Sequence, residues 1–156
     1  MKDLRNQGLS NATVTNNGAT FNLAGKLGGC YSFDGSNDYF SLTNFNMSNW
    51  SEFTLVFWCY TGTNLNGVFA VRDSGTYCLA LTDSAFAYRD SQHSALTHIA
   101  VTQPNQNTWT HYVISYNNGI INIYQDGNLI VDNVGSSGAI LNNTNEIRIG
   151  RRQTSS

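Results

Sequence analysis

The feature that most constrains the fold is a pair of hairpin signals in the second half of the chain. Three runs of alternating apolar and polar residues cover 109–116, 120–125 and 128–131, and they are joined by Asn117-Asn118-Gly119 and Asp126-Gly127. Asn, Asp and Gly reach the positive φ angles of tight hairpin turns at little cost. Successive side chains of a strand lie on opposite faces. The segment is therefore predicted as an antiparallel meander with one face of each strand toward a core.

The composition favours one all-β domain. Only 12% of the residues are charged, whereas 40% are apolar and occur in patterned blocks, which favours strands over amphipathic helices. The formal net charge of −2 supplies no basic surface for nucleic acid. No run reaches the ~18 apolar residues of a membrane span. We expect a single domain over residues 1–156.

The apolar segment 53–60 is predicted as the strongest strand. Its nearly continuous apolarity is typical of a central strand covered on both faces. Further candidate strands lie at 68–72, 77–81, 85–88 and 96–101, a spacing typical of a sandwich or barrel. No helix longer than about three turns is expected. The residues predicted to be largely buried are Phe33, Leu55, Phe57, Trp109, Val113 and Ile123.

Five ordered sequence blocks resemble those of laminin-G-like and pentraxin-like domains. The first is Gly28–Tyr39, which is similar to the family signature Gly-x-x-x-x-Phe-Asp-Gly-x-x-Asp-Tyr. The others cover 53–58, 109–111, 124–127 and 147–150. The resemblance implies a two-sheet antiparallel jelly-roll sandwich of the concanavalin A-like, laminin G-like type, and with it a recognition module.

The chain departs from the family pattern at two places. Pentraxin-like members carry a cysteine pair between two central strands, and Val56 and Val113 stand at the matching positions, so this disulfide is absent. Family members also continue with a closing strand that pairs with the N-terminal strand, whereas this chain stops at Ser156. We therefore expect residues 10–22 to pair with a neighbouring chain or with another part of a longer protein.

The cysteines and acidic residues argue against metal-thiolate and catalytic chemistry. Cys30, Cys59 and Cys78 lie in apolar patterns and are expected to be free, buried small side chains without zinc-ligand spacing. Glycosidases of this jelly roll need two carboxylates about 5–5.5 Å apart in the retaining case. The only glutamates, Glu52 and Glu146, lie near opposite ends of the domain. An enzyme is not expected.

One turn has the spacing of a calcium loop. Asp34, Ser36 and Asp38 match the first three ligand positions of an EF-hand-like loop, but Phe45 replaces the bidentate Glu at the twelfth position. Many members of the resembling family bind Ca²⁺ at one rim of the sandwich. The alternative is that Asp34 forms a tight Asx-type turn without an ion, which is the simpler interpretation.

Ligand-binding residues are expected in a polar loop and beside the strongest strand. Trp58 and Trp109 match structural positions of the family and are predicted to be core residues. Trp50 lies in a polar run and is the second candidate for an exposed platform. The first candidate is the turn after 85–88, whose hydrogen-bonding side chains are Tyr88, Arg89, Asp90, Gln92 and His93.

These patterns predict a non-catalytic module that recognises cell-surface or extracellular glycans. The alternative is a structural or adhesion domain of a virion or surface protein that binds protein partners and no sugar. The N-terminus lacks the apolar segment of a signal peptide. The low-charge composition, rich in Asn, Ser and Thr, is associated with phage tail or fibre proteins, so an extracellular or virion location is expected. Partners would be a glycan, a surface protein or a second copy of the chain.

Overall fold

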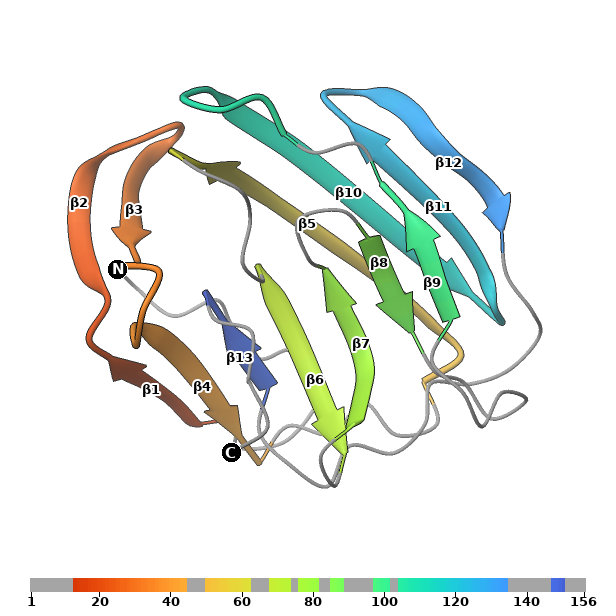
Figure 1. Cartoon of the computed structure of the whole chain (residues 1–156), viewed down its shortest axis with the longest axis horizontal. Helices are drawn as coiled ribbons and strands as arrows, with labels where there is room; N and C mark the ends of the chain where they lie inside the picture. The colour runs from red at the N-terminus through yellow and green to blue at the C-terminus, as the bar shows by residue number, and fades with distance from the viewer. Residues whose placement is uncertain are drawn as a thin grey trace.

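The computed structural model describes residues 13–44, 50–62, 68–73, 76–81, 85–88, 97–101, 104–134 and 147–150. Within these ranges the regular structure consists of β-strands alone (Figure 1), so the expectation of no long helix holds there and no described segment could cross a membrane as a helix. The strands are β1 (Thr13–Asn17), β2 (Thr20–Gly25), β3 (Gly28–Ser32), β4 (Tyr39–Thr43), β5 (Glu52–Tyr60), β6 (Phe69–Asp73), β7 (Thr76–Leu81), β8 (Ala85–Tyr88), β9 (Thr97–Ala100), β10 (Trp109–Asn117), β11 (Ile120–Gln125), β12 (Asn128–Val134) and β13 (Ile147–Ile149).

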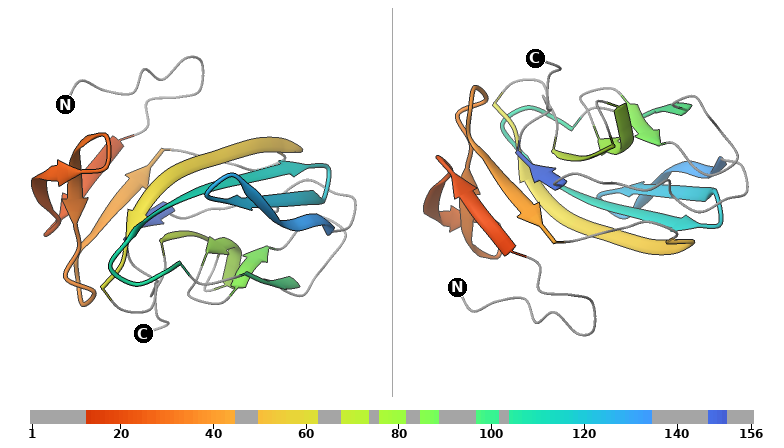
Figure 2. Two further views of the ribbon diagram at one scale, coloured as in Figure 1. Left: turned by 90° about the horizontal axis from the view of Figure 1, so that it is seen from above. Right: turned by 90° about the horizontal axis from the view of Figure 1, so that it is seen from below.

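The strands form a sandwich of two main sheets. A seven-stranded sheet has the order β1-β4-β13-β6-β7-β8-β9, and a four-stranded sheet has the order β12-β11-β10-β5. A separate hairpin, β2–β3, flanks them. Every pairing between strands is antiparallel. The two main sheets face each other (Figure 2), as the predicted jelly-roll class requires.

The meander predicted from the hairpin signals is confirmed. Asn118 and Gly119, with φ angles of 48° and 90°, connect β10 to β11. Asp126 and Gly127, with φ angles of 50° and 83°, connect β11 to β12. Positive φ at both central positions is the conformation that these residue types favour in two-residue hairpins.

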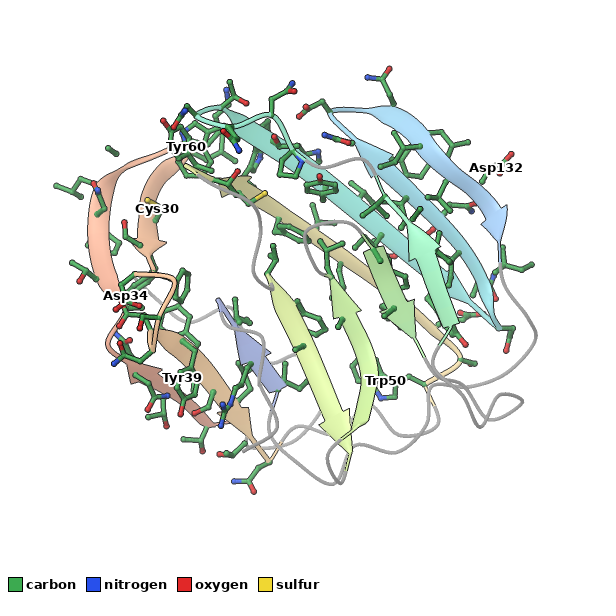
Figure 3. All side chains as sticks on the ribbon, in the orientation of Figure 1. Cys30, Asp34, Tyr39, Trp50, Tyr60 and Asp132 are labelled. Carbon is green, nitrogen blue, oxygen red and sulfur yellow. The ribbon has the colours of Figure 1, made fainter. Side chains whose placement is uncertain are left out.

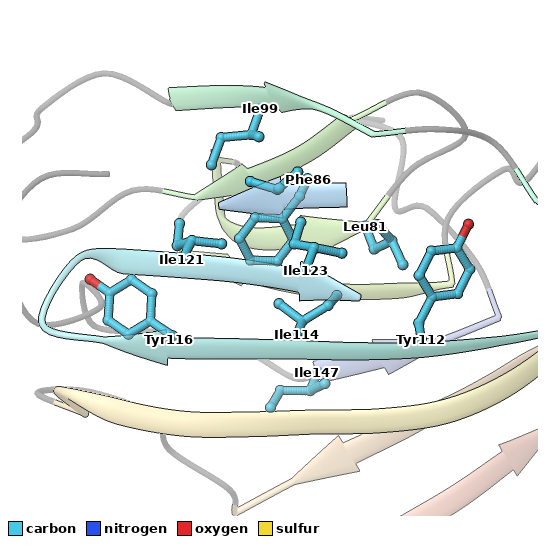
Figure 4. Packing of buried hydrophobic residues seen from close by; sticks show 10 residues of the cluster. Leu81, Phe86, Ile99, Tyr112, Ile114, Tyr116, Ile121, Ile123 and Ile147 are labelled. Atoms are coloured by element: carbon cyan, nitrogen blue, oxygen red, sulfur yellow. The ribbon is translucent and has the colours of Figure 1, made fainter. Parts of the chain in front are cut away.

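The core lies between the two main sheets and is built from alternate residues of their strands (Figure 4). In β10, the inward side chains are Tyr112, Ile114 and Tyr116, none of which is more than 1% exposed. The residues between them are only partly buried. The other members of the buried cluster are Leu81, Phe86, Ile99, Ile121, Ile123, Val131 and Ile147.

Only part of the predicted core is correct. Ile123 is fully buried as expected, whereas Leu55 and Phe57 pack against the core cluster but stay partly exposed. The prediction is wrong for Trp109 and Val113, which lie on the partly exposed parity of β10. Both parities of this strand carry large apolar side chains, so alternation by itself did not reveal which one faces the second sheet.

Phe33 is also less buried than predicted. It precedes the turn between β3 and β4 and is partly exposed rather than buried in the core. Its ring contacts Phe40 edge-on, with 5.5 Å between ring centroids, and Phe40 contacts Tyr31 in the same way at 4.7 Å. Phe33 thus belongs to a separate aromatic cluster at the β3–β4 end of the sandwich.

The prediction that the segment 53–60 is a central strand with both faces covered is wrong. In the described part of the chain, β5 pairs with β10 alone and forms one edge of the four-stranded sheet. Val56 and Tyr60 remain 61% and 52% exposed on its outer face. The pairing of Val56 with Val113 in the β5–β10 register does agree with the positions that the family resemblance assigned to a disulfide.

The N-terminal segment finds partners within the chain. β1 pairs with β4 from Thr13↔Thr43 to Asn17↔Tyr39, and β2 pairs with β3. β4 lies between β13 and β1 in its sheet, so β4 supplies one partner for β1. Among the described residues the other edge of β1 has no paired strand, and pairing of residues 10–22 with a strand from outside the chain stays a prediction.

Two of the cysteines are free, as predicted. Cys30 and Cys59 are partly buried and form no disulfide. Burial, followed by the negative charge of Asp126, raises the pKa of the Cys59 thiol to about 11. Cys59 is therefore almost entirely protonated at neutral pH, as expected for a packing residue rather than a nucleophile.

Candidate functional site

The polar loop predicted to bind ligand lies mostly outside the described residues. Tyr88 is the last residue of β8, and its backbone pairs with Leu79 and Thr97. Arg89, Asp90, Gln92 and His93 follow in the part of the chain that the structure leaves undescribed. Ligand binding by this loop stays a prediction.

Trp50, the second predicted platform, is not an open ring on the surface. It is partly buried and packs against the core cluster just before β5. It also lies far from the Asp34 turn (Figure 3), so the fold does not bring the two predicted sites together. Packing against the core leaves less of the ring for a ligand.

The Asp34 turn is held together by its own carboxylates. Asp34 Oδ1 accepts hydrogen bonds from the backbone N–H groups of Ser36, Asn37 and Asp38 at 2.8, 3.0 and 3.2 Å. Asp38 Oδ2 accepts a hydrogen bond from the N–H of Asp34 at 3.1 Å. This is the arrangement expected for the Asx-type turn.

The hydrogen bonds around Asp34 are those of a hydrogen-bonded turn. Backbone N–H groups point at Asp34 Oδ1, whereas Ca²⁺ needs six to eight oxygens around it. Among the described residues, no group of three or more His, Cys, Asp or Glu side chains could hold a metal ion. Calcium binding by Asp34, Ser36 and Asp38 stays a prediction.

The turn makes stability depend on the charge of Asp34. Hydrogen bonds from the Ser36 and Asn37 N–H groups lower the pKa of Asp34 below its ordinary value of 3.8. The ionised carboxylate therefore stabilises the fold above about pH 3.8, and this contribution is lost as the pH falls through the lower native pKa. We expect Asp34→Asn to be less stable than wild type at neutral pH, with the difference shrinking in acid. Urea unfolding at several pH values measures this, with the exposed Asp132→Asn as the control.

The outer face of the four-stranded sheet carries an unpredicted row of aromatic side chains. Tyr60 and Trp58 of β5 lie directly opposite Trp109 and His111 of β10 in the register. Because Phe57 and Tyr112 between them stack toward the core, these four side chains point the other way. We call Trp58, Tyr60, Trp109 and His111 the aromatic ladder.

The rings of the aromatic ladder contact one another in pairs. The Trp58 and His111 centroids are 4.8 Å apart with a tilt of 36°, and the Tyr60 and Trp109 centroids are 5.6 Å apart with a tilt of 58°. The Lys26 ammonium, from the β2–β3 turn, lies 5.1 Å from the centroid of Trp58. A cation at this distance is attracted to the ring face. Lys26 thus lies at the Trp58 end of the ladder, and the Tyr60–Trp109 pair forms the other end.

Two hydrogen bonds between His111 and Asp126 hold the ladder beside the β11–β12 turn. The His111 N–H donates to Asp126 Oδ1 at 2.8 Å, and the Asp126 N–H donates to the His111 carbonyl at 2.9 Å. Farther along the same outer face the paired residues are polar, with Thr54 opposite Ser115 and Ser115 opposite Asn122. The face therefore combines apolar rings with hydroxyl and amide groups.

The aromatic ladder was missed because its two tryptophans were assigned to the core. One signal in the sequence was available. Trp58 and Tyr60 share one strand parity, while Phe57 and Cys59 share the other, so one of the two sets had to point away from the core. The same holds for Trp109 and His111 against their neighbours in β10.

Comparison with known proteins agrees with the fold. Residues 34–156 match the laminin G family of the concanavalin A-like lectin/glucanases superfamily, and the chain belongs to this family. A search of curated protein sequences found no match.

Among solved structures, the chain is similar to domain 4 of AbnA, a GH43 extracellular arabinanase from Geobacillus stearothermophilus, in complex with arabinotriose. The TM-score is 0.70 at 15% sequence identity, over 92% of this chain and 75% of that one. At this identity the likeness shows a shared fold.

Proposed function

We propose that this domain is a non-catalytic module that recognises glycans through the aromatic ladder. The observation that carries the proposal is Tyr60, a large ring that is 52% exposed, paired with Trp109 on a face that the core does not use. An exposed ring with a polar edge suits a sugar, because a pyranose or furanose ring presents C–H groups on its faces and hydroxyls around its rim. The arabinotriose bound by domain 4 of AbnA supports the same class of ligand.

The polar part of the outer face would complete such a site. Hydroxyl and amide groups of Ser115 and Asn122 lie on the same face and can exchange hydrogen bonds with sugar hydroxyls. A small ligand on an open face retains little free energy after its own ordering cost, so single-site affinity is expected to be weak. Adhesion at a cell surface or as part of a virion, which we retain as the proposed setting, would depend on several copies acting together.

The absence of catalysis is part of the proposal. Of the two glutamates, Glu52 is exposed at the start of β5 and Glu146 lies outside the described residues. In the described part of the chain, no group of three or more His, Cys, Asp or Glu side chains could hold a metal ion. A glycoside hydrolase needs a positioned pair of carboxylates, whereas the aromatic ladder consists of aromatic side chains.

Binding of a panel of oligosaccharides, including arabino-oligosaccharides, tests the proposal. We expect Tyr60→Ala and Trp109→Ala each to weaken binding at least ~10-fold, about 1.4 kcal/mol. Phe21→Ala removes a ring of similar exposure, 48%, from β2 and should leave binding unchanged. Isothermal titration and chemical shifts in ¹⁵N-labelled protein provide the measurement.

Two outcomes would contradict the proposal in different ways. A glycan array that stays blank for the wild-type protein would favour a structural domain that binds protein partners. Binding that survives Tyr60→Ala but is lost in His93→Ala would move the site to the polar loop.

A further inference from the structure

Two charged side chains flank the aromatic ladder on opposite sides. Lys26 comes from the β2–β3 turn, which lies beside the C-terminal end of β5 (Figure 1), and its ammonium is 5.1 Å from the centroid of the Trp58 ring. Asp126 comes from the β11–β12 turn, and its Oδ1 accepts a hydrogen bond from the His111 N–H at 2.8 Å. Trp58 and His111 are partners in the β5–β10 register. A cation therefore lies on the β5 side of this pair and a carboxylate on the β11 side.

The Lys26 ammonium keeps hydrogen-bond donors for a ligand. Lys26 is exposed, and an ammonium group has three N–H donors. The Trp58 ring lies on one side of this tetrahedral group, so donors remain on the side that faces solvent. The attraction between the cation and the ring also restricts a long side chain that is otherwise flexible. Less side-chain entropy is then lost when Lys26 binds a ligand.

A short oligosaccharide can span the ladder from Tyr60 to Lys26. Tyr60 and Trp58 lie two residues apart on the same face of β5, or roughly 6.6 Å apart at ~3.3 Å per residue. A sugar that stacks on Tyr60 therefore places its own substituents, or those of the next sugar, over the Trp58 ring and within reach of the lysine. An anionic substituent gains most there, because charge-assisted hydrogen bonds are stronger than neutral ones.

We propose that the aromatic ladder recognises acidic sugars and that Lys26 determines this specificity. The sugar ring stacks on Tyr60 and Trp109, while its carboxylate or sulfate group accepts hydrogen bonds from the Lys26 ammonium. The inference rests on the proposed function, because it names the class of sugar bound at the same site. Asp126 fixes the orientation of the ligand, since its carboxylate repels an anionic group on the β11 side.

The attraction is local and depends on one side chain. The chain has a formal net charge of −2, so no overall positive field draws an acidic glycan to the surface. Specificity of this origin should disappear when Lys26 alone loses its charge. A matched control exists on the other sheet, where the Arg148 guanidinium carbon lies 4.3 Å from the centroid of the Tyr39 ring.

Pairs of ligands that differ only in charge test the specificity. A galacturonate trimer and its methyl ester probe the carboxylate, and a sulfated galactan oligomer and its desulfated form probe the sulfate. A glycan array of other acidic sugars beside their neutral counterparts covers further backbones. By isothermal titration, we expect wild type to bind the acidic member of at least one pair about fivefold more tightly than the neutral member. Only the binding of acidic members should weaken as the salt concentration rises.

Three substitutions assign the preference to its cause. Lys26→Met keeps an unbranched side chain against Trp58 and should bind both members of a pair equally. Arg148→Met removes the same charge from the other cation–ring contact and should keep the wild-type preference. Asp126→Asn keeps an acceptor for the His111 N–H and should bind the acidic member more tightly than wild type does. Circular dichroism checks that each variant is folded.

Each possible failure has a separate meaning. Binding of neutral sugars with no preference for acidic ones would overturn this inference and leave the proposed function standing. A preference that survives Lys26→Met would overturn the role of Lys26, and its loss in Arg148→Met alone would move the site to the other sheet. Wild-type protein that binds no sugar of either kind would overturn the proposed function and this inference with it.

Discussion

Phe86→Ala is expected to lower the free energy of unfolding by about 3–5 kcal/mol, the cost of lost transfer free energy plus an unfilled cavity. Phe86 lies in β8, has no exposed surface, and packs in the cluster between the two sheets. It comes from the seven-stranded sheet and packs with Ile121 and Ile123 of the four-stranded sheet in one cluster (Figure 4). Its loss therefore weakens the contact between the layers. Urea unfolding followed by tryptophan fluorescence measures the change.

Two control substitutions sharpen this prediction. Phe21→Ala removes a ring that is 48% exposed and contacts the Tyr31 ring edge-on, so we expect a smaller loss of about 1 kcal/mol. Phe57→Ala should fall between the two, because Phe57 touches the core but stays partly exposed at the sheet edge. Equal losses for Phe86→Ala and Phe21→Ala would mean that the space between the sheets is not a packed core.

Gly150→Ala is expected to cost about 2–5 kcal/mol. Gly150 follows β13 with a φ of 92°, a conformation that costs a residue with a Cβ roughly 1–2 kcal/mol. A Cβ there would also overlap the Phe33 ring, whose displacement adds about 1–3 kcal/mol of overpacking. The Gly150 N–H donates to the Val68 carbonyl at 3.1 Å, so the backbone has little freedom to adjust.

Gly127→Ala separates the two parts of that cost. Gly127 has a similar φ of 83°, but no atom lies within 4 Å of the position that a Cβ would take. Its substitution should therefore show the conformational cost alone, about 1–2 kcal/mol. Equal losses at Gly150 and Gly127 would mean that the Phe33 ring moves aside freely.

For the candidate site, the sequence predicted the types of residue that could bind a ligand, but not how residues from different strands are brought together. The Asp34 turn was recognisable, since an Asp followed by Gly and Ser supplies its own hydrogen-bond acceptor within the same five residues. The aromatic ladder was not recognisable, because it depends on residues from β5 and β10 that lie about fifty positions apart and meet only through strand pairing. The Tyr88–His93 loop is a prediction from residue types alone.

The sequence by itself determined the strand class, the hairpin turns and the sets of residues that share a face. These are local properties, set by alternation along a strand and by the positive φ of Asn118 and Asp126. Only the tertiary structure decided which face is covered. In β10, the set of alternate residues that includes Trp109 and the set that includes Tyr112 are both rich in large side chains. Local patterning therefore favours neither set as the buried face. The docking of the second sheet buried the parity of Tyr112 and left the tryptophan on the outer face, because a strand side chain is buried only where another layer packs on it.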